Sequence, residues 1–261
     1  MHIHPVYGIS APERGWVPAP RYLLRRDRVL RLLAGLPAGR LLEIGCGSGA
    51  LLYDMARSGF HVSGLEQSAE ARDLALYINR ETRGLQIFET PEKDWGSAFD
   101  HVLSFEVLEH IEDDAAALQQ WHSWLKPGGH LLLSVPAHRS RWSASDEWAG
   151  HCRRYERQGL LDLLRDCGFS PQVVQCYGFP LSNLIDPFRA IYHGRRLRRS
   201  VMRDRADCSL RSGIERSLET KLYPLEASLP GTLCMQFFFA LQKLFLNTSL
   251  GTGFIALCTR Q

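Results

Sequence analysis

The residues best placed to do chemistry surround a glycine-rich stretch, LLEIGCGSGA, at residues 41–50. An apolar run that contains one acid, Glu43, leads into three alternating glycines, and a helical apolar pattern follows at once. This order predicts a buried strand, a tight turn and a helix whose free N–H groups face a ligand, because glycine permits sharp turns and close backbone approach. Glu43 favours a cationic ligand over a pyrophosphate.

A second acid, Glu66, ends the next predicted strand and lies 21 residues after Gly45. At this spacing a carboxylate reaches the hydroxyl pair of a ribose, because its two oxygens can accept a hydrogen bond from each hydroxyl. The alternative is a surface acid at a strand end. Together the two acids predict a site for a nucleoside that carries a positive charge.

Three motifs in order resemble those of one family. They are LLEIGCGSG at residues 41–49, FDHVLSFEVLEHI at 99–111 and LKPGG at 125–129. In this combination the chain resembles the class I S-adenosylmethionine-dependent methyltransferases, in particular the branch that acts on quinone precursors, sugars and other small acceptors. A nicotinamide or flavin domain is the competing interpretation, since GCGSGA also fits G-x-G-x-x-A. Such dehydrogenases have no reason to carry the third motif.

The resemblance implies an α/β fold with a Rossmann-like seven-stranded sheet, helices on both faces and a last antiparallel strand. It implies S-adenosyl-L-methionine as the methyl donor. It also implies a set of donor-binding residues: Glu43, Gly45, Cys46, Gly47, Gly49, Glu66, Gln67, Thr90, Ser104, Phe105 and Glu106. In the family, residues just after the third strand contact the adenine ring, and here these positions are Glu89, Thr90 and Pro91.

Polar residues crowd the segment DEWAGHCRRY at residues 146–155, just past the fifth predicted strand. Similar stretches border the acceptor pocket in methyltransferases of this branch, which implies substrate-binding roles for Arg154 and Tyr155. A hydroxyl acceptor needs a base, and histidine suits this task because its ordinary pKa is near 6.5. We expect His151 to be this base and keep His110 as a second candidate. A structural role for His151 and Arg154, paired with Asp146 and Glu147, is the alternative. Some quinone-precursor methyltransferases need a divalent cation near a comparable L-E-H segment, which makes Glu109 and His110 candidate ligands, but two ligands do not establish a site and no metal site is predicted.

The segment at residues 180–250 exceeds what the minimal fold needs, and we expect it to be an inserted helical cap. The donor-binding domain would then comprise residues 1–179 and 251–261. Residues 188–216 contain nine arginines and three acids, and residues 229–251 suit a mostly apolar helix. A solvated surface, recognition of an anionic acceptor and contact with an anionic membrane through residues 189–246 all remain open for this segment. The apolar helix would equally serve as cap core or as a homodimer contact.

Composition sets further bounds. The net charge of +3 is too small to indicate nucleic-acid binding, and no run of about 18 apolar residues predicts a spanning helix. Seven scattered cysteines without a C-x-x-C pair favour a reducing cytoplasm over a disulfide framework. The arginines between apolar positions of the helix expected at residues 21–36 are interpreted as a solvated face, with a substrate contact as the alternative. In the resembling family a helix here often covers the methyl donor, which makes Tyr22 and Arg26 further candidates.

The predicted function is transfer of a methyl group from S-adenosylmethionine to a small-molecule acceptor, with a hydroxyl oxygen as the expected accepting atom. One alternative is a lipid-like or anionic, phosphate-linked acceptor at a membrane surface. The others are an NAD-dependent dehydrogenase and a binding protein that keeps the fold without catalysis.

Overall fold

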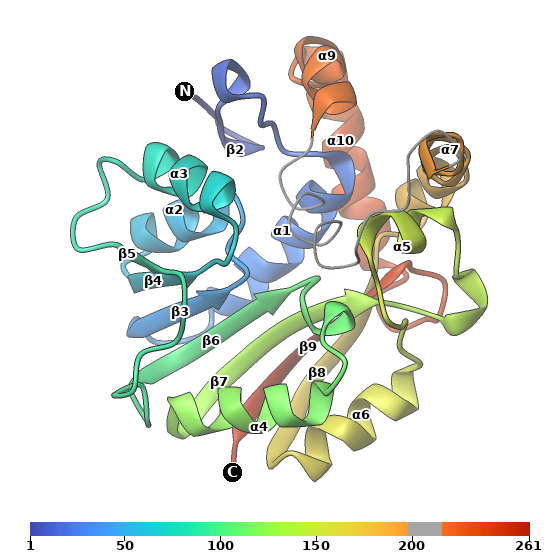
Figure 1. Cartoon of the computed structure of the whole chain (residues 1–261). Coiled ribbons are helices and arrows are strands. Elements are labelled where there is room, and N and C mark those ends of the chain that lie inside the picture. The colour runs from blue at the N-terminus through green and yellow to red at the C-terminus, as the bar shows by residue number, and fades with distance from the viewer. Residues whose placement is uncertain (198–215) are drawn as a thin grey trace.

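A seven-stranded sheet forms the centre of the protein (Figure 1), which a computed structural model describes at residues 1–197 and 216–261. The strand order is β5-β4-β3-β6-β7-β9-β8, and only β9 runs antiparallel to its two neighbours within this sheet. The strands are β3 (Arg40–Ile44), β4 (His61–Leu65), β5 (Gln86–Phe88), β6 (Phe99–Phe105), β7 (Leu125–Pro136), β8 (Phe169–Tyr177) and β9 (Gly253–Arg260). The predicted Rossmann-like sheet with its last antiparallel strand is confirmed.

Helices cover both faces of the sheet (Figure 1). On one face, α4 (Asp114–Trp124) and α6 (Arg157–Asp166) bury Trp121, Leu160 and Leu164 against β6, β7 and β8. On the other, α1 (Pro20–Leu33) and α2 (Ala50–Arg57) bury apolar side chains against β3 and β4, and α3 (Ala69–Ile78) packs beside them. Burial on both faces explains why the central strands are nearly continuous apolar runs.

Local sequence signals set several element boundaries. Pro20 opens α1, where its missing N–H costs nothing. The hydroxyl of Ser68 caps α3 by accepting a hydrogen bond from the N–H of Ala71, as the sequence predicts. The sequence K-P-G-G at residues 126–129, which is typical of a turn, lies inside the long strand β7. The pairing of β7 with β6 skips from Leu125 to His130 there, so the K-P-G-G sequence forms a bulge in the ladder.

Two additions lie above the carboxyl ends of the strands. The first is an N-terminal hairpin of β1 (His2–His4) and β2 (Gly8–Ser10). The second comprises α7 (Leu181–Leu197), α9 (Ser217–Glu226) and α10 (Leu229–Lys243), which fall between β8 and β9 in the chain (Figure 1). The division into a donor-binding domain and an inserted cap stays a prediction, and most of the arginine-rich stretch lies outside the described residues.

Candidate active site

The glycine turn between β3 and α2 forms the floor of a large cavity. Gly45, Gly47 and Gly49 all have positive φ angles, which favour glycine. A Cβ added at Gly49 would lie 2.8 Å from the Cβ of Ala75, so this glycine lets α3 pack against the turn. A Cβ added at Gly47 would meet no atom within 4 Å. The backbone of Gly47 is therefore open to a ligand in the cavity.

Two carboxylates flank this turn. Glu66 accepts hydrogen bonds from the N–H groups of Gly47 and Ser68, both at 2.9 Å, so one side chain ties the ends of β3 and β4 together. Glu43 is buried, and its Oε2 atom has no hydrogen-bond partner among the residues that the structure describes. Burial, reinforced by the negative charge of Glu66, raises the pKa of Glu43 to about 8. A positively charged group bound beside Glu43 would give the unpartnered oxygen a hydrogen-bond donor and would stabilise the ionised carboxylate.

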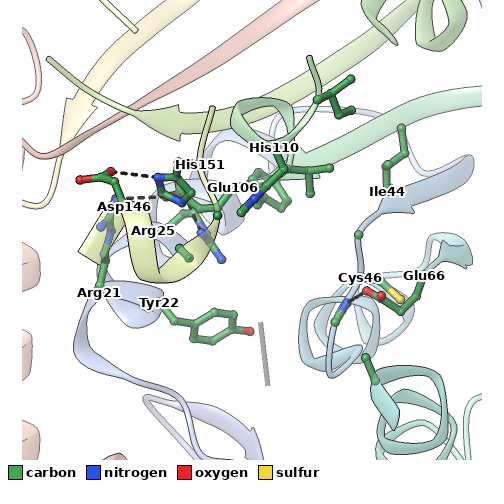
Figure 2. A pocket seen from close by; sticks show the side chains of 18 of the residues that line it. Arg21, Tyr22, Arg25, Ile44, Cys46, Glu66, Glu106, His110, Asp146 and His151 are labelled. Atoms are coloured by element: carbon green, nitrogen blue, oxygen red, sulfur yellow. Dashed lines mark hydrogen bonds and ion pairs between the residues drawn. The ribbon is translucent and has the colours of Figure 1, made fainter. Parts of the chain in front are cut away.

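The cavity has a volume of about 1510 Å³, which exceeds the usual size of a site for one small molecule and suits two. Most of the predicted site residues line it: Glu43, Gly45, Cys46, Gly47, Glu66, Gln67, Thr90, Phe105, Glu106, His110, His151 and Arg154. Figure 2 shows the glycine turn and Glu66 on one side and Glu106, His110 and His151 on the other. The candidate donor residues and the candidate bases therefore share one cavity.

Glu106 is held by a network that the sequence analysis missed. Its carboxylate pairs with Arg21 at 3.0 Å and Arg25 at 3.8 Å, and it accepts hydrogen bonds from the hydroxyls of Ser134 and Tyr177. Burial alone would raise the pKa of Glu106, but the two arginines outweigh it and hold the pKa at about 2. Glu106 is therefore ionised and fixed in place, whatever it contacts in a bound molecule.

The interpretation of the α1 arginines as a solvated face is wrong. Arg21 and Arg25 are four residues apart, so they lie on one side of the helix and point into the cavity. Arg26 pairs with Asp54 on α2 through two hydrogen bonds of 2.6 and 2.7 Å. The four-residue spacing of Arg21 and Arg25 is the signal that could have revealed this role.

The candidate base is part of a buried polar cluster. The Nδ1 atom of His151 lies 2.9 Å from Oδ1 of Asp146 (Figure 2). The same Oδ1 atom also accepts a 2.7 Å hydrogen bond from Nε of Arg154. Burial would raise the pKa of Asp146, but hydrogen bonds from His151 and Arg154 hold it well below its usual range. Asp146 sits at the start of the short helix α5 (Ala144–Ala149), and His151 follows the glycine that ends it. The geometry is thus compatible with both roles considered for His151, because its ring is paired with Asp146 and also lines the cavity.

His110 lies edge-on to His151, with ring centroids 4.8 Å apart. Burial and the neighbouring His151 lower the pKa of His110 to about 4, so its ring is neutral near pH 7. Glu109 is fully buried beside them, and neither of its carboxylate oxygens has a hydrogen-bond partner. Burial and the charge of Glu106 raise the pKa of Glu109 well above its ordinary value.

Glu109, His110 and His151 bring three potential metal-ligand atoms within 4.8 Å of one another. Two imidazoles and a carboxylate are a donor set that divalent transition metals accept. The sequence prediction named no metal site, and the structure adds this cluster as a place where a divalent cation could bind. The same geometry is also compatible with a role for His151 as a base, so it does not distinguish a metal ligand from a base.

Three predicted site residues lie outside the cavity lining. Gly49 serves helix packing, and Ser104 is buried within β6. Tyr155, expected to contact the acceptor, is buried, and its hydroxyl donates a 2.9 Å hydrogen bond to Asp114 on α4. Its backbone also bonds with Pro136 and His138, so Tyr155 fixes the loop after β7 rather than bordering the acceptor pocket.

A family model described as a methyltransferase domain matches residues 19–174, which include the glycine turn, both acids and the 146–155 segment. The chain belongs to the class I S-adenosylmethionine-dependent methyltransferases. The competing dehydrogenase interpretation is thereby set aside. S-adenosylmethionine is the methyl donor of this family, and the residues present fit it: Glu66 for the ribose, the open backbone of Gly47, and the unpartnered oxygen of Glu43 for positive charge.

Curated relatives of this methyltransferase include two ubiquinone biosynthesis O-methyltransferases. That of Alkalilimnicola ehrlichii is 36% identical over 118 residues, which cover 43% of this chain and 47% of the relative. That of Ruegeria pomeroyi is 35% identical over 162 residues, which cover 54% and 62%. The chain thus spans about half the length of the curated relatives it matches.

Solved structures share the fold. An S-adenosylmethionine-dependent methyltransferase from Mesorhizobium loti has a TM-score of 0.54 at 17% identity and covers 93% of this chain and 98% of its own. The [4+2]-cyclase SpnF has a TM-score of 0.56 at 19% identity, covering 99% and 87%. At sequence identities this low, the structural similarity establishes only the fold of this methyltransferase.

Proposed function

We propose that the chain transfers a methyl group from S-adenosylmethionine to a hydroxyl oxygen of a small-molecule acceptor, and that His151 takes the hydroxyl proton. The observation that carries this proposal is the pairing of His151 with the buried carboxylate of Asp146 at the cavity wall, at 2.9 Å. The printed names of the two O-methyltransferase relatives support oxygen as the accepting atom.

The pairing supports a separate role for each ring nitrogen of His151. In this proposal Nδ1 donates its hydrogen bond to Asp146, so Nε2 is the nitrogen that accepts the hydroxyl proton. The Nε2 atom makes no hydrogen bond to a described residue, and its nearest ionic neighbour is Oε1 of Glu109 at 3.8 Å. Nε2 is thus free to accept a proton from a hydroxyl in the cavity. Asp146, itself anchored by Arg154, then stabilises the imidazolium that forms.

The bound donor supplies a methyl group on a sulfonium leaving group, so the protein needs only to position the acceptor and remove its proton. The network around Glu106 supports this positioning, because Arg21 and Tyr177 lock the carboxylate between the donor and acceptor sides of the cavity. The neutral ring of His110 packs against His151 and limits its rotation.

One further observation favours an acceptor that carries an anionic group. Arg189 of α7 lines the cavity and makes no hydrogen bond or ion pair with any residue that the structure describes. Burial and the nearby positive charge of Arg21 lower the pKa of Arg189, and the carboxylates of Glu219 and Asp186 offset only part of this effect. A carboxylate or phosphate on the acceptor would give this guanidinium the partner it lacks.

The test is to incubate the protein with S-adenosylmethionine radiolabelled in the methyl group and with aqueous, lipid and macromolecular fractions of a cell extract. We expect counts in a small-molecule product and a loss of about 10²–10⁴-fold in rate for His151→Asn. His61→Asn is the matched control, because His61 is exposed at the start of β4 and lies outside the cavity lining. Counts on protein or RNA, or a fully active His151→Asn, would contradict the proposal.

A further inference from the structure

The surface of α9 and α10 carries little negative charge, because the only acids of these two helices, Glu219 and Glu226, are both partly buried. Between residues 221 and 250, the exposed side chains are apolar, neutral or lysine, and none is acidic. Seven large apolar side chains are among them: Leu222, Leu225, Leu229, Leu233, Phe237, Leu244 and Leu250. A typical soluble surface mixes charges of both signs at about a quarter or more of its positions, so this composition is unusual.

The apolar side chains of α10 form a stripe. Leu229, Leu233 and Phe237 are each four residues apart, and Leu244 continues the same side at the end of the helix. The opposite side of α10 is also apolar and packs Met235 into a cluster with residues of α1. A helix that is apolar on both sides is normally buried on both, yet Leu229 is 73% exposed. The outward stripe thus needs a partner that its own core does not supply.

A second stripe lies on α7. Leu184, Phe188 and Ile191 fall at helical spacing and are exposed, Phe188 by 74%. Arg189 and His193, on the other side of this helix, line the cavity. Both α7 and α10 contact α1, and with α9 they lie at the end of the molecule beyond the carboxyl ends of the strands (Figure 1). One helix therefore separates the cavity from the outward apolar surface.

The charge around the stripes identifies the partner. Lys221 is exposed in the middle of α9, Lys243 is exposed at the end of α10, and Arg195 is exposed near the end of α7. A second copy of this chain would bring these like charges together, and a protein interface also needs a polar rim of both signs. Helices with an apolar stripe and flanking cations are typical of proteins that lie in the interface of an anionic lipid bilayer. None of the described helices is long and apolar enough to cross a bilayer.

We propose that the outward faces of α7, α9 and α10 form a docking surface for an anionic membrane. Leucine and phenylalanine side chains would enter the boundary between headgroups and acyl chains, and the flanking cations would contact the headgroups. The wall of the cavity formed by α7 would then lie next to the lipid surface.

The test is flotation of the full chain with vesicles of phosphatidylcholine alone and of phosphatidylcholine and phosphatidylglycerol in equal parts. We expect wild type to float with the mixed vesicles only. Leu233→Asp/Phe237→Asp and Leu184→Asp/Phe188→Asp should each lower the bound fraction at least about tenfold. The matched control is Ile3→Asp/Leu76→Asp, which changes exposed apolar residues outside this surface and should leave binding unchanged. Retained binding of S-adenosylhomocysteine would establish that each variant is folded.

Three results would overturn the proposal. The first is wild type that stays unbound with both kinds of vesicle. The second is a control pair that loses binding as strongly as the surface variants. The third is light scattering that finds a dimer abolished by Leu233→Asp/Phe237→Asp, without any vesicle binding, which would make this face a contact between two copies of the chain. None of these results depends on methyl transfer.

Discussion

The substitution Glu43→Gln tests how the donor side of the cavity works. Glutamine keeps the shape of the side chain but cannot ionise. The pKa of Glu43 is raised by burial from the ordinary 4.5 to about 8. Since one pKa unit corresponds to about 1.36 kcal/mol, ionised Glu43 costs the free protein up to about 5 kcal/mol.

The free energy of unfolding depends on pH because the folded and unfolded chains release the Glu43 proton at different pH values. The unfolded chain releases the Glu43 proton near pH 4.5, whereas the folded chain keeps it until about pH 8. The folded state binds more protons between these values, so Glu43 makes the protein less stable as the pH rises through this range. Glu43→Gln should therefore match wild type in free energy of unfolding at pH 4.5 and exceed it by up to about 5 kcal/mol at pH 8.

Glu43→Gln should stabilise the folded protein but weaken its binding of S-adenosylhomocysteine. The demethylated product, S-adenosylhomocysteine, keeps an ammonium group, and a charge-assisted hydrogen bond to Glu43 contributes about 1.5–3 kcal/mol. Calorimetry at pH 8 should therefore give Glu43→Gln a dissociation constant about tenfold to hundredfold weaker than that of wild type. Wild-type affinity should rise from pH 6 towards pH 8, roughly in step with ionisation of Glu43, and that of the variant should not.

Glu66→Gln is the matched control, because it makes the same chemical change at a carboxylate that already accepts two backbone hydrogen bonds. It should weaken product binding without any gain in stability. The reasoning fails if urea unfolding gives Glu43→Gln no added stability at pH 8. It fails equally if the variant binds S-adenosylhomocysteine as tightly as wild type.

Four further outcomes are expected. His151→Asn should lower kcat by about 10²–10⁴-fold and leave calorimetric affinity for S-adenosylhomocysteine unchanged, whereas parallel losses would indicate a collapsed site. Tyr155→Phe loses the hydrogen bond to Asp114, so urea unfolding should show a loss of about 1 kcal/mol in stability while kcat is unaffected. A large fall in kcat would instead indicate that Tyr155 contacts the acceptor. Gly47→Ala should lose about 1–2 kcal/mol of stability, because residue 47 has a positive φ angle. Its affinity for S-adenosylhomocysteine should fall by more than this amount, because the added methyl group would enter the space for the ligand. Unchanged affinity would contradict the placement of the ligand beside Gly47. Dialysis against a chelator should leave methyl transfer intact, and loss of activity that zinc or magnesium restores would instead make Glu109, His110 and His151 metal ligands.

Much of the fold could be predicted from the sequence because its signals are local. Alternating glycines after an apolar run predict the turn at residues 45–49, and Ser68 predicts a helix start. The bulge at residues 126–129 could not be predicted, because K-P-G-G carries ordinary turn signals and only its pairing with β6 keeps it inside a strand.

The acceptor side was harder to predict, because its contacts join residues far apart in the chain. Arg21 and Glu106 are 85 residues apart, and nothing near either one indicates the other. Tyr155 illustrates the opposite error. The resemblance of its segment to stretches that border the acceptor pocket in the family implied an acceptor contact, but its hydroxyl donates a hydrogen bond to Asp114, 41 residues away. Spacing along the chain predicted which residues gather at the strand ends, and it could not predict which way each one faces.

The proposed chemistry is tested most directly by nuclear magnetic resonance of the reaction product. The protein would be incubated with the active extract fraction and S-adenosylmethionine labelled with ¹³C in its methyl group. A methyl carbon bonded to oxygen resonates apart from one bonded to nitrogen or carbon. We expect a single O-methyl signal on a small molecule, and its absence with His151→Asn. An N-methyl or C-methyl signal, or label on a macromolecule, would contradict the account.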